Sequence, residues 1–428
     1  MEFQNTLEFA QKLDQQDKLN HYQSQFIFPQ HNGKNVIYFT GNSLGLQPKS
    51  AQYYINEVMN DWANLAVEGH FFAEKPWWDY HERLAEPLSK IVGAKPSEIT
   101  VMNTLTINLH LLMVSFYKPT SKRFKIICEE KAFPSDQYML QSQVKHHGYN
   151  PDEALVEVKR REGEHNIRLE DILAKIEEVG DELALVLWGG VNYYTGQVFD
   201  MKAITQAGHK IGAYVGFDLA HAAGNIQMEL HQWEVDFAAW CSYKYMNSGP
   251  GNASGCFVHE KHHQSNLPRF AGWWGHNKER RFKMEPMFDP VQGADGWQVS
   301  NLPVLTLAPY LASLQMFDEV GMEMLVQKRD LITSYLEYIL HDIDAQIPDT
   351  HFEIITPSHP SERASQLSVY LHGQGRKLFD YLMANGVITD WREPNVIRLA
   401  PVPLYCSFED MYNFGQILKQ GILFLSNE

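Results

Sequence analysis

The fold-deciding stretch of this sequence spans residues 213–250 and reads AYVGFDLAHAAGNIQMELHQWEVDFAAWCSYKYMNSGP. It contains two short apolar runs, 214–217 and 237–241, which are rich in aromatic residues and alanine. Apolar runs of this length, bounded by Gly, Asp and Asn, predict buried strands of a parallel sheet. The first run ends at Asp218, and the second leads toward Lys244. Open α/β sheets bind ligands at the carboxyl ends of their strands, so both side chains are expected at that edge.

An acid and a lysine at two adjacent strand ends suit the chemistry of pyridoxal phosphate. This cofactor is held as a Schiff base on a lysine, and a carboxylate pairs with its pyridine nitrogen. Taken alone, Asp218 is better explained as a helix cap and Lys244 as a solvated loop residue. His221 and Tyr243 lie beside them in the sequence, and the four residues together favour a cofactor site.

The length of 428 residues favours one large and one small domain. We expect an N-terminal helix and lead-in segment at 1–47, a large cofactor-binding domain at 48–305 and a small C-terminal domain at 306–428. The net charge of −16 argues against nucleic acid or an anionic membrane as the main partner. No run approaches the ~20 apolar residues that a membrane span needs.

The cysteines and the first residues favour a cytoplasmic protein. The first 20 residues are acidic and amphipathic, unlike a signal peptide. The cysteines show no C-x-x-C pairing, and three of them sit in apolar runs typical of buried core thiols. They are Cys128, Cys241, Cys256 and Cys406. The pair His262 and His263 has no third ligand at a useful spacing, so we interpret it as surface and predict no metal site.

Two further strand-like runs lead into helices that begin with polar residues. Thr106 follows the run 99–102 at the start of an apolar helix, where free N–H groups and the helix dipole suit a phosphate. Thr106 would cap that helix with or without a phosphate. Ser135 and Asp136 flank the start of the next helix, and capping is again the alternative explanation. Phe133, just before them, is well placed to stack on a planar ring.

The alternation of strands and helices from about 99 to 258 predicts a doubly wound α/β domain. The apolar runs 124–129 and 183–190 are further strands of its sheet, and 201–210 is a crossover helix. A long helical region from about 304 to 341 leads into a second domain, whose smaller sheet is expected to be antiparallel or mixed.

Three other side chains are candidates for substrate contacts. Ser43 lies in a turn rich in Gly and Asn, which either approaches a ligand or simply joins a strand to a helix. His70 lies in an aromatic loop and could stack on an aromatic substrate or pack against its neighbours. Arg398 ends a strand and could clamp an α-carboxylate with two hydrogen bonds or lie on the surface.

Nine stretches of the chain, between Gly41 and Tyr405, resemble the kynureninase family of pyridoxal-phosphate enzymes. The most specific are FDLAHAAGN, WCSYKY and APVPLY. The resemblance implies the α/β architecture known as fold type I. It consists of a large domain with a mostly parallel seven-stranded sheet between helices and a smaller C-terminal α+β domain.

The resemblance also implies roles for individual residues. Lys244 resembles the Schiff-base lysine and Asp218 the partner of the pyridinium nitrogen, while Tyr243 is a candidate acid or base. The implied cofactor contacts are Leu105, Thr106, Phe133, Ser135, Asp136, Asp218, His221, Tyr243, Lys244, Trp273 and Asn301. The implied substrate contacts are Ser43, His70, Asn301 and Arg398. Trp273 and Asn301 are similar to residues that the neighbouring subunit contributes, so the resemblance implies a homodimer with shared active sites.

The implied reaction is hydrolysis of L-kynurenine, and of 3-hydroxy-L-kynurenine, to anthranilate or 3-hydroxyanthranilate and L-alanine, in tryptophan catabolism or NAD biosynthesis. Relatives can carry a hydroxyl residue where this chain has Gly189, and the position of Trp274 varies with ring-hydroxylation preference. A cysteine desulfurase or an aminotransferase would share Lys244 and Asp218. A desulfurase also needs a reactive cysteine, for which Cys406 is the one candidate. A cofactor-binding regulator without turnover is the non-enzyme alternative.

Overall fold

A central sheet of seven strands forms the larger part of the molecule. The computed structural model describes residues 2–347 and 352–426. The strand order is β6-β12-β11-β10-β9-β7-β8. The strands are β6 (Ile99–Met102), β7 (Lys125–Glu129), β8 (Leu155–Val158), β9 (Leu183–Gly189), β10 (Tyr214–Asp218), β11 (Phe237–Trp240) and β12 (Ser254–Val258). Only β12 pairs antiparallel with its neighbours among these strands, which confirms the prediction of a mostly parallel seven-stranded sheet.

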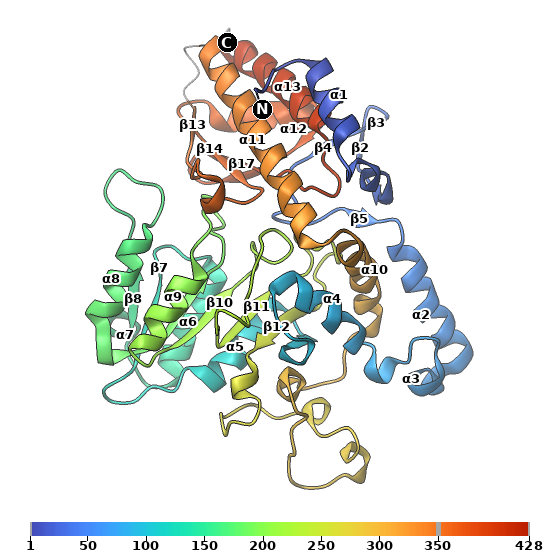
Figure 1. Ribbon diagram of the computed structural model, residues 1–428, viewed down its shortest axis with the longest axis vertical. Helices are drawn as coiled ribbons and strands as arrows, with labels where there is room; N and C mark the ends of the chain where they lie inside the picture. The colour runs from blue at the N-terminus through green and yellow to red at the C-terminus, as the bar shows by residue number, and fades with distance from the viewer. Residues whose placement is uncertain (1, 348–351, 427–428) are drawn as a thin grey trace.

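Helices cover both faces of this sheet (Figure 1). Strand β9 is apolar because both of its faces are buried. Val186 and Trp188 belong to one hydrophobic cluster of the core, whereas Leu185 and Leu187 belong to a second cluster. A strand buried on both faces has no polar alternation. The helices of this part are α2 (Ala51–Leu65), α3 (Gly69–Phe72), α4 (Glu82–Val92), α5 (Leu105–Phe116), α6 (Pro134–His146), α7 (Pro151–Ala154), α8 (Leu169–Val179), α9 (Met201–Lys210) and α10 (Val304–Val320).

The smaller part is built on a four-stranded antiparallel sheet with the order β13-β14-β17-β16. Its strands are β13 (Phe352–Ile354), β14 (Leu367–Leu371), β16 (Asp390–Arg392) and β17 (Val396–Leu399). Its helices are α11 (Met322–Gln346), α12 (Gly375–Ala384) and α13 (Phe408–Ser426). The expected long helical region is therefore two helices, α10 and α11, which meet at Gly321.

The N-terminal segment lies with the C-terminal elements. Figure 1 shows α1 (Leu7–Gln16) beside α13, and the two helices are in contact. Strand β4 (Ile37–Tyr38) pairs in parallel with β15 (Val387–Ile388). Two short antiparallel pairs complete the segment, β1 (Phe26–Ile27) with β5 (Gln47–Pro48) and β2 (Gln30–His31) with β3 (Lys34–Asn35).

The domain limits 1–47, 48–305 and 306–428 stay a prediction. Within the third range, α10 packs against α2 and α4 of the larger part, whereas α11 packs against α13. Across residues 2–347 and 352–426, no helix is both long and apolar enough to cross a membrane.

Candidate active site

A cavity of about 540 Å³ lies at the carboxyl edge of the large sheet, between that sheet and the strands β16 and β17. Most of the predicted site residues line it. They are Ser43, Leu105, Thr106, Phe133, Ser135, Asp136, Asp218, His221, Tyr243, Lys244 and Arg398. These residues come from loops and strand ends far apart in the sequence, so the fold brings them together at the edge where open α/β sheets bind ligands.

Asp218 and Lys244 reach the cavity from neighbouring strands. Asp218 is the last residue of β10, and its Oδ1 accepts a hydrogen bond of 2.7 Å from the amide of Ala220. Lys244 lies in the loop after β11, against the turn that contains Gly45. A Cβ atom at Gly45 would lie only 2.5 Å from the Lys244 carbonyl oxygen, so the glycine permits this close approach. The glycine-rich turn therefore supports the lysine loop.

Two carboxyl groups share the floor of the cavity. Burial raises the pKa of Asp136 well above its ordinary value, and the neighbouring Asp218 adds to the shift. Burial also raises the pKa of Asp218, but a hydrogen bond from Asp136, the amide of Ala220 and the charge of Lys244 oppose that rise. The rise is greater for Asp136, so Asp136 holds its proton more readily and Asp218 is the better candidate for the carboxylate. A carboxylate is the form that a partner for a pyridinium nitrogen requires.

The first turns of α5 and α6 flank the cavity. Thr104, not Thr106, is the residue that precedes α5, and the Thr106 hydroxyl lies 2.7 Å from the Ser135 hydroxyl. The predicted capping role of Thr106 is therefore wrong. Helix α6 begins at Pro134, so Ser135 and Asp136 lie inside its first turn. Phe133 precedes the helix, and its side chain makes no capping hydrogen bond. The N–H groups in the first turn of α5 and that of Ser135 in α6 suit an anionic group such as a phosphate. Pro134 has no N–H, and the Asp136 amide donates to the Phe133 carbonyl at 2.8 Å.

Tyr243 and His221 are both uncharged in the cavity. Burial raises the pKa of Tyr243, and the nearby Cys241 adds to the rise. The Cys241 thiol donates to the Tyr243 hydroxyl oxygen at 3.4 Å. Burial lowers the pKa of His221 well below its ordinary value, and the charge of Lys244 lowers it further. Tyr243 therefore keeps a proton that it can donate, and His221 presents a neutral ring.

Arg398 enters the cavity from β17 with its side chain 1% exposed. Its Nη1 donates to the Tyr193 carbonyl at 2.7 Å, and its Nη2 donates to Asp390. Arg392 donates to the same Asp390 oxygen at 3.2 Å. Two guanidinium groups around one carboxylate leave an excess positive charge, so the arrangement suits a second carboxylate from a ligand. The alternative of a surface arginine at position 398 is wrong.

Sequence reasoning missed Arg392, Asp390 and Glu129, although Arg392 and Glu129 line the cavity. The register of the β16–β17 pair sets Asp390 opposite Arg398, and the sequence carries no local signal of that register for the first two. Glu129 ends β7 just before the Phe133 turn, and a polar residue at a strand end was the signal for it.

Three predicted site residues lie outside this cavity: His70, Trp273 and Asn301. His70 is on α3, where its ring packs edge-on against Trp77 at 5.3 Å. Trp273 is 40% exposed, and its indole N–H donates to the Arg281 carbonyl at 3.0 Å. Asn301 is exposed and lies two residues after Val299, whose carbonyl accepts from the amide of Trp274 at 3.3 Å.

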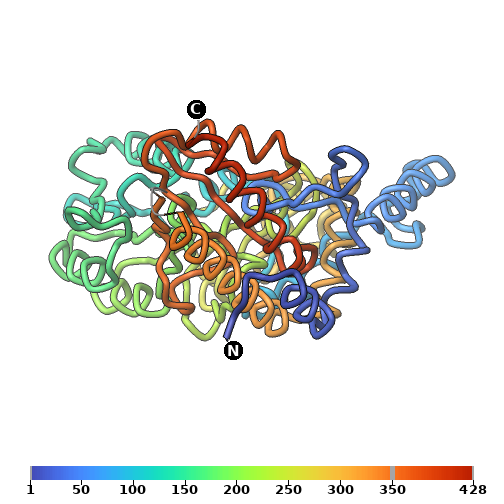
Figure 2. Tube along the Cα trace, turned by 90° about the horizontal axis from the view of Figure 1, so that it is seen from above, coloured from blue at the N-terminus to red at the C-terminus, as the bar shows by residue number. Residues whose placement is uncertain are grey.

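An exposed aromatic cluster, which includes the buried ring of Trp274, gathers around Trp273 and is defined by Phe71, Trp78, Trp273, Trp274 and Phe282. The rings of Trp78 and Phe282 stack at 5.1 Å, and Trp78 contacts Trp273 and Trp274 edge-on. Phe71 lies 5.7 Å from Trp78 and next to His70 in the chain. In Figure 2 the segment with α2 and α3 projects from the rest of the molecule.

The cavity fits pyridoxal phosphate by its unpaired polar atoms. Within the described part of the chain, Asp136 Oδ1, His221 Nδ1 and Arg398 Nε are buried and have no hydrogen-bond partner. Buried polar atoms are normally paired, and atoms left unpaired around a cavity point to a ligand. An amine, a carboxylate, a neutral ring and two helix starts are the donor set that this cofactor uses.

The cysteines offer no reactive thiol at the cavity mouth. All four are free and buried, as predicted for three of them. Cys406 accepts a hydrogen bond from the amide of Val402, its thiol donates to the Tyr38 carbonyl at 3.3 Å, and burial raises its pKa. A desulfurase nucleophile needs an accessible thiolate, so Cys406 does not fit that role.

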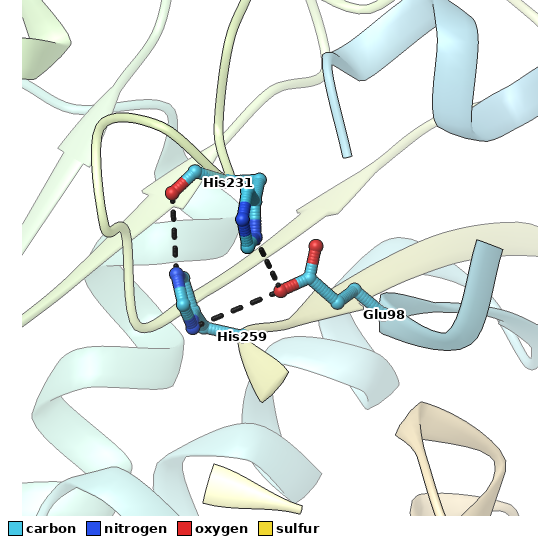
Figure 3. A group of neighbouring side chains, drawn as sticks. All are labelled: Glu98, His231 and His259. Atoms are coloured by element: carbon cyan, nitrogen blue, oxygen red, sulfur yellow. Dashed lines mark hydrogen bonds and ion pairs between the residues drawn. The ribbon is translucent and has the colours of Figure 1, made fainter. Parts of the chain in front are cut away.

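Glu98, His231 and His259 form a second cluster of titratable residues (Figure 3), and none of them lines the cavity. Its potential ligand atoms are already engaged by the protein. Glu98 Oε1 accepts from His231 Nδ1 at 2.9 Å and from the amide of Glu260 at 2.8 Å. His259 Nδ1 accepts from the amide of Lys261 at 3.1 Å. The cluster therefore serves as a hydrogen-bonded link between three segments.

Solved structures of low sequence identity share this fold. One is a cystine C-S lyase in complex with cysteine persulfide, with a TM-score of 0.76, 18% identity and coverage of 90% of this chain and 97% of that chain. Another is a cysteine desulfurase from Escherichia coli, with a TM-score of 0.75, 13% identity and coverage of 94% and 98%. A related structure carries glycine linked to a pyridoxal-phosphate cofactor. The fold-type-I prediction is confirmed.

Family models and relatives extend the comparison to the whole chain. The aminotransferase class-V model matches residues 37–269, and the kynureninase C-terminal domain model matches residues 328–418. Kynureninase from Flavobacterium psychrophilum is 81% identical over 424 residues, which cover 99% of this chain and 100% of that protein. Kynureninases from Flavobacterium johnsoniae and Christiangramia forsetii are 80% and 70% identical over the same shares. The chain therefore belongs to the kynureninase family.

Proposed function

We propose that this protein hydrolyses L-kynurenine, and also 3-hydroxy-L-kynurenine, to anthranilate or 3-hydroxyanthranilate and L-alanine, with pyridoxal phosphate bound at Lys244. The observation that carries the proposal is the cavity in which Lys244, Asp218, Tyr243 and Arg398 meet. The 81% identity to a protein named kynureninase supports the substrate. Tryptophan catabolism and NAD biosynthesis are the settings in which such a reaction is used.

In this proposal Arg398 orients the amino-acid substrate. Its guanidinium is already fixed by Asp390 and the Tyr193 carbonyl, so little side-chain entropy is lost when a carboxylate binds. Its buried Nε has no partner in the described residues and is free to donate. The α-carboxylate of the substrate would therefore bind on the β16–β17 side, with its α-carbon toward Lys244.

Lys244, Asp218 and Tyr243 divide the proton chemistry. Pyridoxal phosphate supplies an electron sink for the bonds that break at the substrate. Lys244 would hold the cofactor, and its amine, when free, would take the proton from the substrate α-carbon. Asp218 would hold a proton on the pyridine nitrogen as its carboxylate partner. Tyr243 keeps its phenolic proton and can give it to the γ-carbonyl oxygen as water adds there.

We further propose a homodimer in which each subunit completes the other's site. His70, Trp273 and Asn301 resemble site residues of the family but lie outside the cavity of their own chain. The exposed aromatic cluster supports the proposal, because Phe71 is 51% and Phe282 57% exposed, and large apolar patches mark interfaces. Trp273 and Asn301 from one subunit would then contact the cofactor and substrate of the other.

A cytoplasmic location is part of the proposal. Four free and buried thiols support it, because disulfides are rare in a reducing compartment. The net charge of −16 supports small molecules, not nucleic acid or a membrane, as binding partners.

A substrate comparison tests the proposed reaction against its rivals. Purified, cofactor-loaded protein is offered L-kynurenine, 3-hydroxy-L-kynurenine and L-cysteine separately, each with and without a 2-keto acid. We expect anthranilate from L-kynurenine without a keto acid, and the two kynurenine rates give the ring preference. Sulfide from L-cysteine would instead identify a desulfurase. Turnover that depends on the keto acid would identify an aminotransferase, and no turnover would leave a cofactor-binding regulator.

A further inference from the structure

Glu129 is a buried carboxyl group at the cavity that the proposed reaction does not use. It is the last residue of β7, it is 6% exposed, and it lines the cavity together with Asp136, Asp218 and Lys244. Burying a carboxyl group is unfavourable unless the group is hydrogen-bonded or neutral. A buried acid beside two other acids therefore needs a specific reason to be there.

The two oxygens of Glu129 have different surroundings. Oε2 accepts a hydrogen bond of 2.9 Å from the side-chain amide of Asn192. Among residues 2–347 and 352–426, no hydrogen bond is made to Oε1, whereas Oε2 is bound by Asn192. One oxygen is thus fixed by the protein while the other is left for a ligand.

Gly189 provides the space for this free oxygen. A Cβ atom at Gly189 would lie 2.9 Å from Glu129 Oε1, which is closer than a normal contact. Gly189 ends β9 and is paired with Asp218 of β10, so Glu129, Gly189 and Asp218 lie in a row along the carboxyl edge. The missing side chain at 189 lets the Glu129 carboxyl reach across the end of β9 toward Asp218.

The surroundings of Glu129 favour its protonated form. Two other carboxyl groups, Asp136 and Asp218, line the same cavity together with Lys244, Arg392 and Arg398, and burial disfavours the charged form of a carboxyl group. Burial raises the pKa of Glu129 to about 7, Asn192 opposes the rise and the charge of Asp218 adds to it. A neutral carboxyl group carries a proton that it can donate.

We propose that Glu129 is a cofactor-binding residue: its carboxyl group, reaching through the space that Gly189 leaves, donates a hydrogen bond from Oε1 to a polar atom of the pyridoxal ring. The inference rests on the proposed function only in requiring pyridoxal phosphate in this cavity, and it does not depend on the substrate. Gly189 and Glu129 then act as a pair, because a side chain at 189 displaces the carboxyl group.

The test measures the dissociation constant of pyridoxal phosphate by absorbance titration of the apoprotein. We expect Glu129→Ala to weaken binding about tenfold, as for loss of one hydrogen bond. Glu129→Gln keeps a donor without a charge and is expected to stay within about threefold of wild type. Gly189→Ala as a single change should weaken cofactor binding. In a double variant with Glu129→Ala it should cause no further loss, because the effects of substituting residues in contact are not additive.

A matched control is Glu98→Gln, which alters a fully buried glutamate outside the cavity and should leave the dissociation constant unchanged. The inference is overturned if Glu129→Ala binds the cofactor as tightly as wild type does. If the melting temperature of that variant falls at the same time, Glu129 only holds Asn192 in place. The inference is also overturned if Glu129→Gln is as weak as Glu129→Ala, since a negative charge would then be needed. Failure of the wild-type protein to bind the cofactor would count against the proposed function itself.

Discussion

At the scale of single residues, Arg398 is the side chain whose removal separates substrate binding from cofactor binding. It is almost fully buried, and its contacts are with Asp390 and Tyr193 on the carboxylate side of the cavity. We expect Arg398→Ala to weaken amino-acid binding by ~2–5 kcal/mol, because it removes a desolvated partner of a carboxylate. Titration of the holoprotein with L-kynurenine measures this, and Arg376→Ala on the exposed face of α12 is the control. Equal losses of cofactor affinity and substrate affinity would contradict the assignment of Arg398 to the substrate site.

Tyr243 has two possible roles, and kinetics can distinguish them. If Tyr243 is a proton donor, its loss should lower kcat. If Tyr243 is a phosphate ligand, its loss should weaken cofactor binding. We expect Tyr243→Phe to lower kcat about 10²-fold, the usual contribution of one acid or base, with little change in cofactor affinity. Stopped-flow turnover and a cofactor titration give the two values. A variant with wild-type kcat and poor cofactor binding would assign Tyr243 to the phosphate.

At the scale of elements, Asp236 joins α9 to the start of β11 and to the segment after β12. Its carboxylate accepts from His209 and His262 at 2.8 Å each, from Lys261 at 2.9 Å and from the amide of Val215 at 2.7 Å. Our interpretation of His262 as a surface residue is therefore wrong, because a buried acid 26 residues away in the sequence binds it. His263 is half-buried, and its Nε2 lies 2.9 Å from the Val258 carbonyl oxygen.

The Asp236 cluster should contribute stability at neutral pH. Burial alone would raise the pKa of Asp236, but the histidine hydrogen bonds and the Lys261 charge outweigh burial and hold it well below its ordinary value. A folded-state pKa below the unfolded one gives stability above about pH 4 that is lost as the pH falls further. We expect Asp236→Asn to lower the free energy of unfolding at pH 7 by about 3 kcal/mol. Urea denaturation measures it, with the fully exposed Asp181→Asn as control. A loss equal to that of the control would contradict the account.

The elements also show how far the sequence alone leads. Apolar runs buried on both faces predicted β9, β10 and β11, and the residues at their ends predicted Asp218 and Lys244. Strand β8 lies in a charged stretch at the edge of the sheet, so its pattern is weak and we did not predict it. Asp390 and Arg392 depend on how β16 and β17 align, which local patterns do not encode. The pairing of β4 with β15 is missed for the same reason. Glu129, in contrast, could have been found from its place at the end of β7.

At the scale of the whole molecule, the proposed dimer makes a prediction about mixed subunits. Lys244→Ala and Trp273→Ala should each be inactive if Trp273 acts in the partner's site. Mixing the two variants creates hybrid dimers in which one site has both native residues, and activity should return to about a quarter of wild type. A mixture that stays inactive while the subunits exchange would place the function of Trp273 within its own chain. Size-exclusion chromatography with light scattering gives the oligomeric state of each sample.

The most direct test of the central claim is product analysis with wild type and Lys244→Ala side by side. Both proteins are incubated with pyridoxal phosphate and L-kynurenine, and anthranilate fluorescence is read together with alanine. We predict equal amounts of anthranilate and alanine from wild type and neither product from a folded Lys244→Ala protein, because the amine that holds the cofactor and moves the proton is gone. Product release by Lys244→Ala at the wild-type rate, or no release by wild type, would contradict the account.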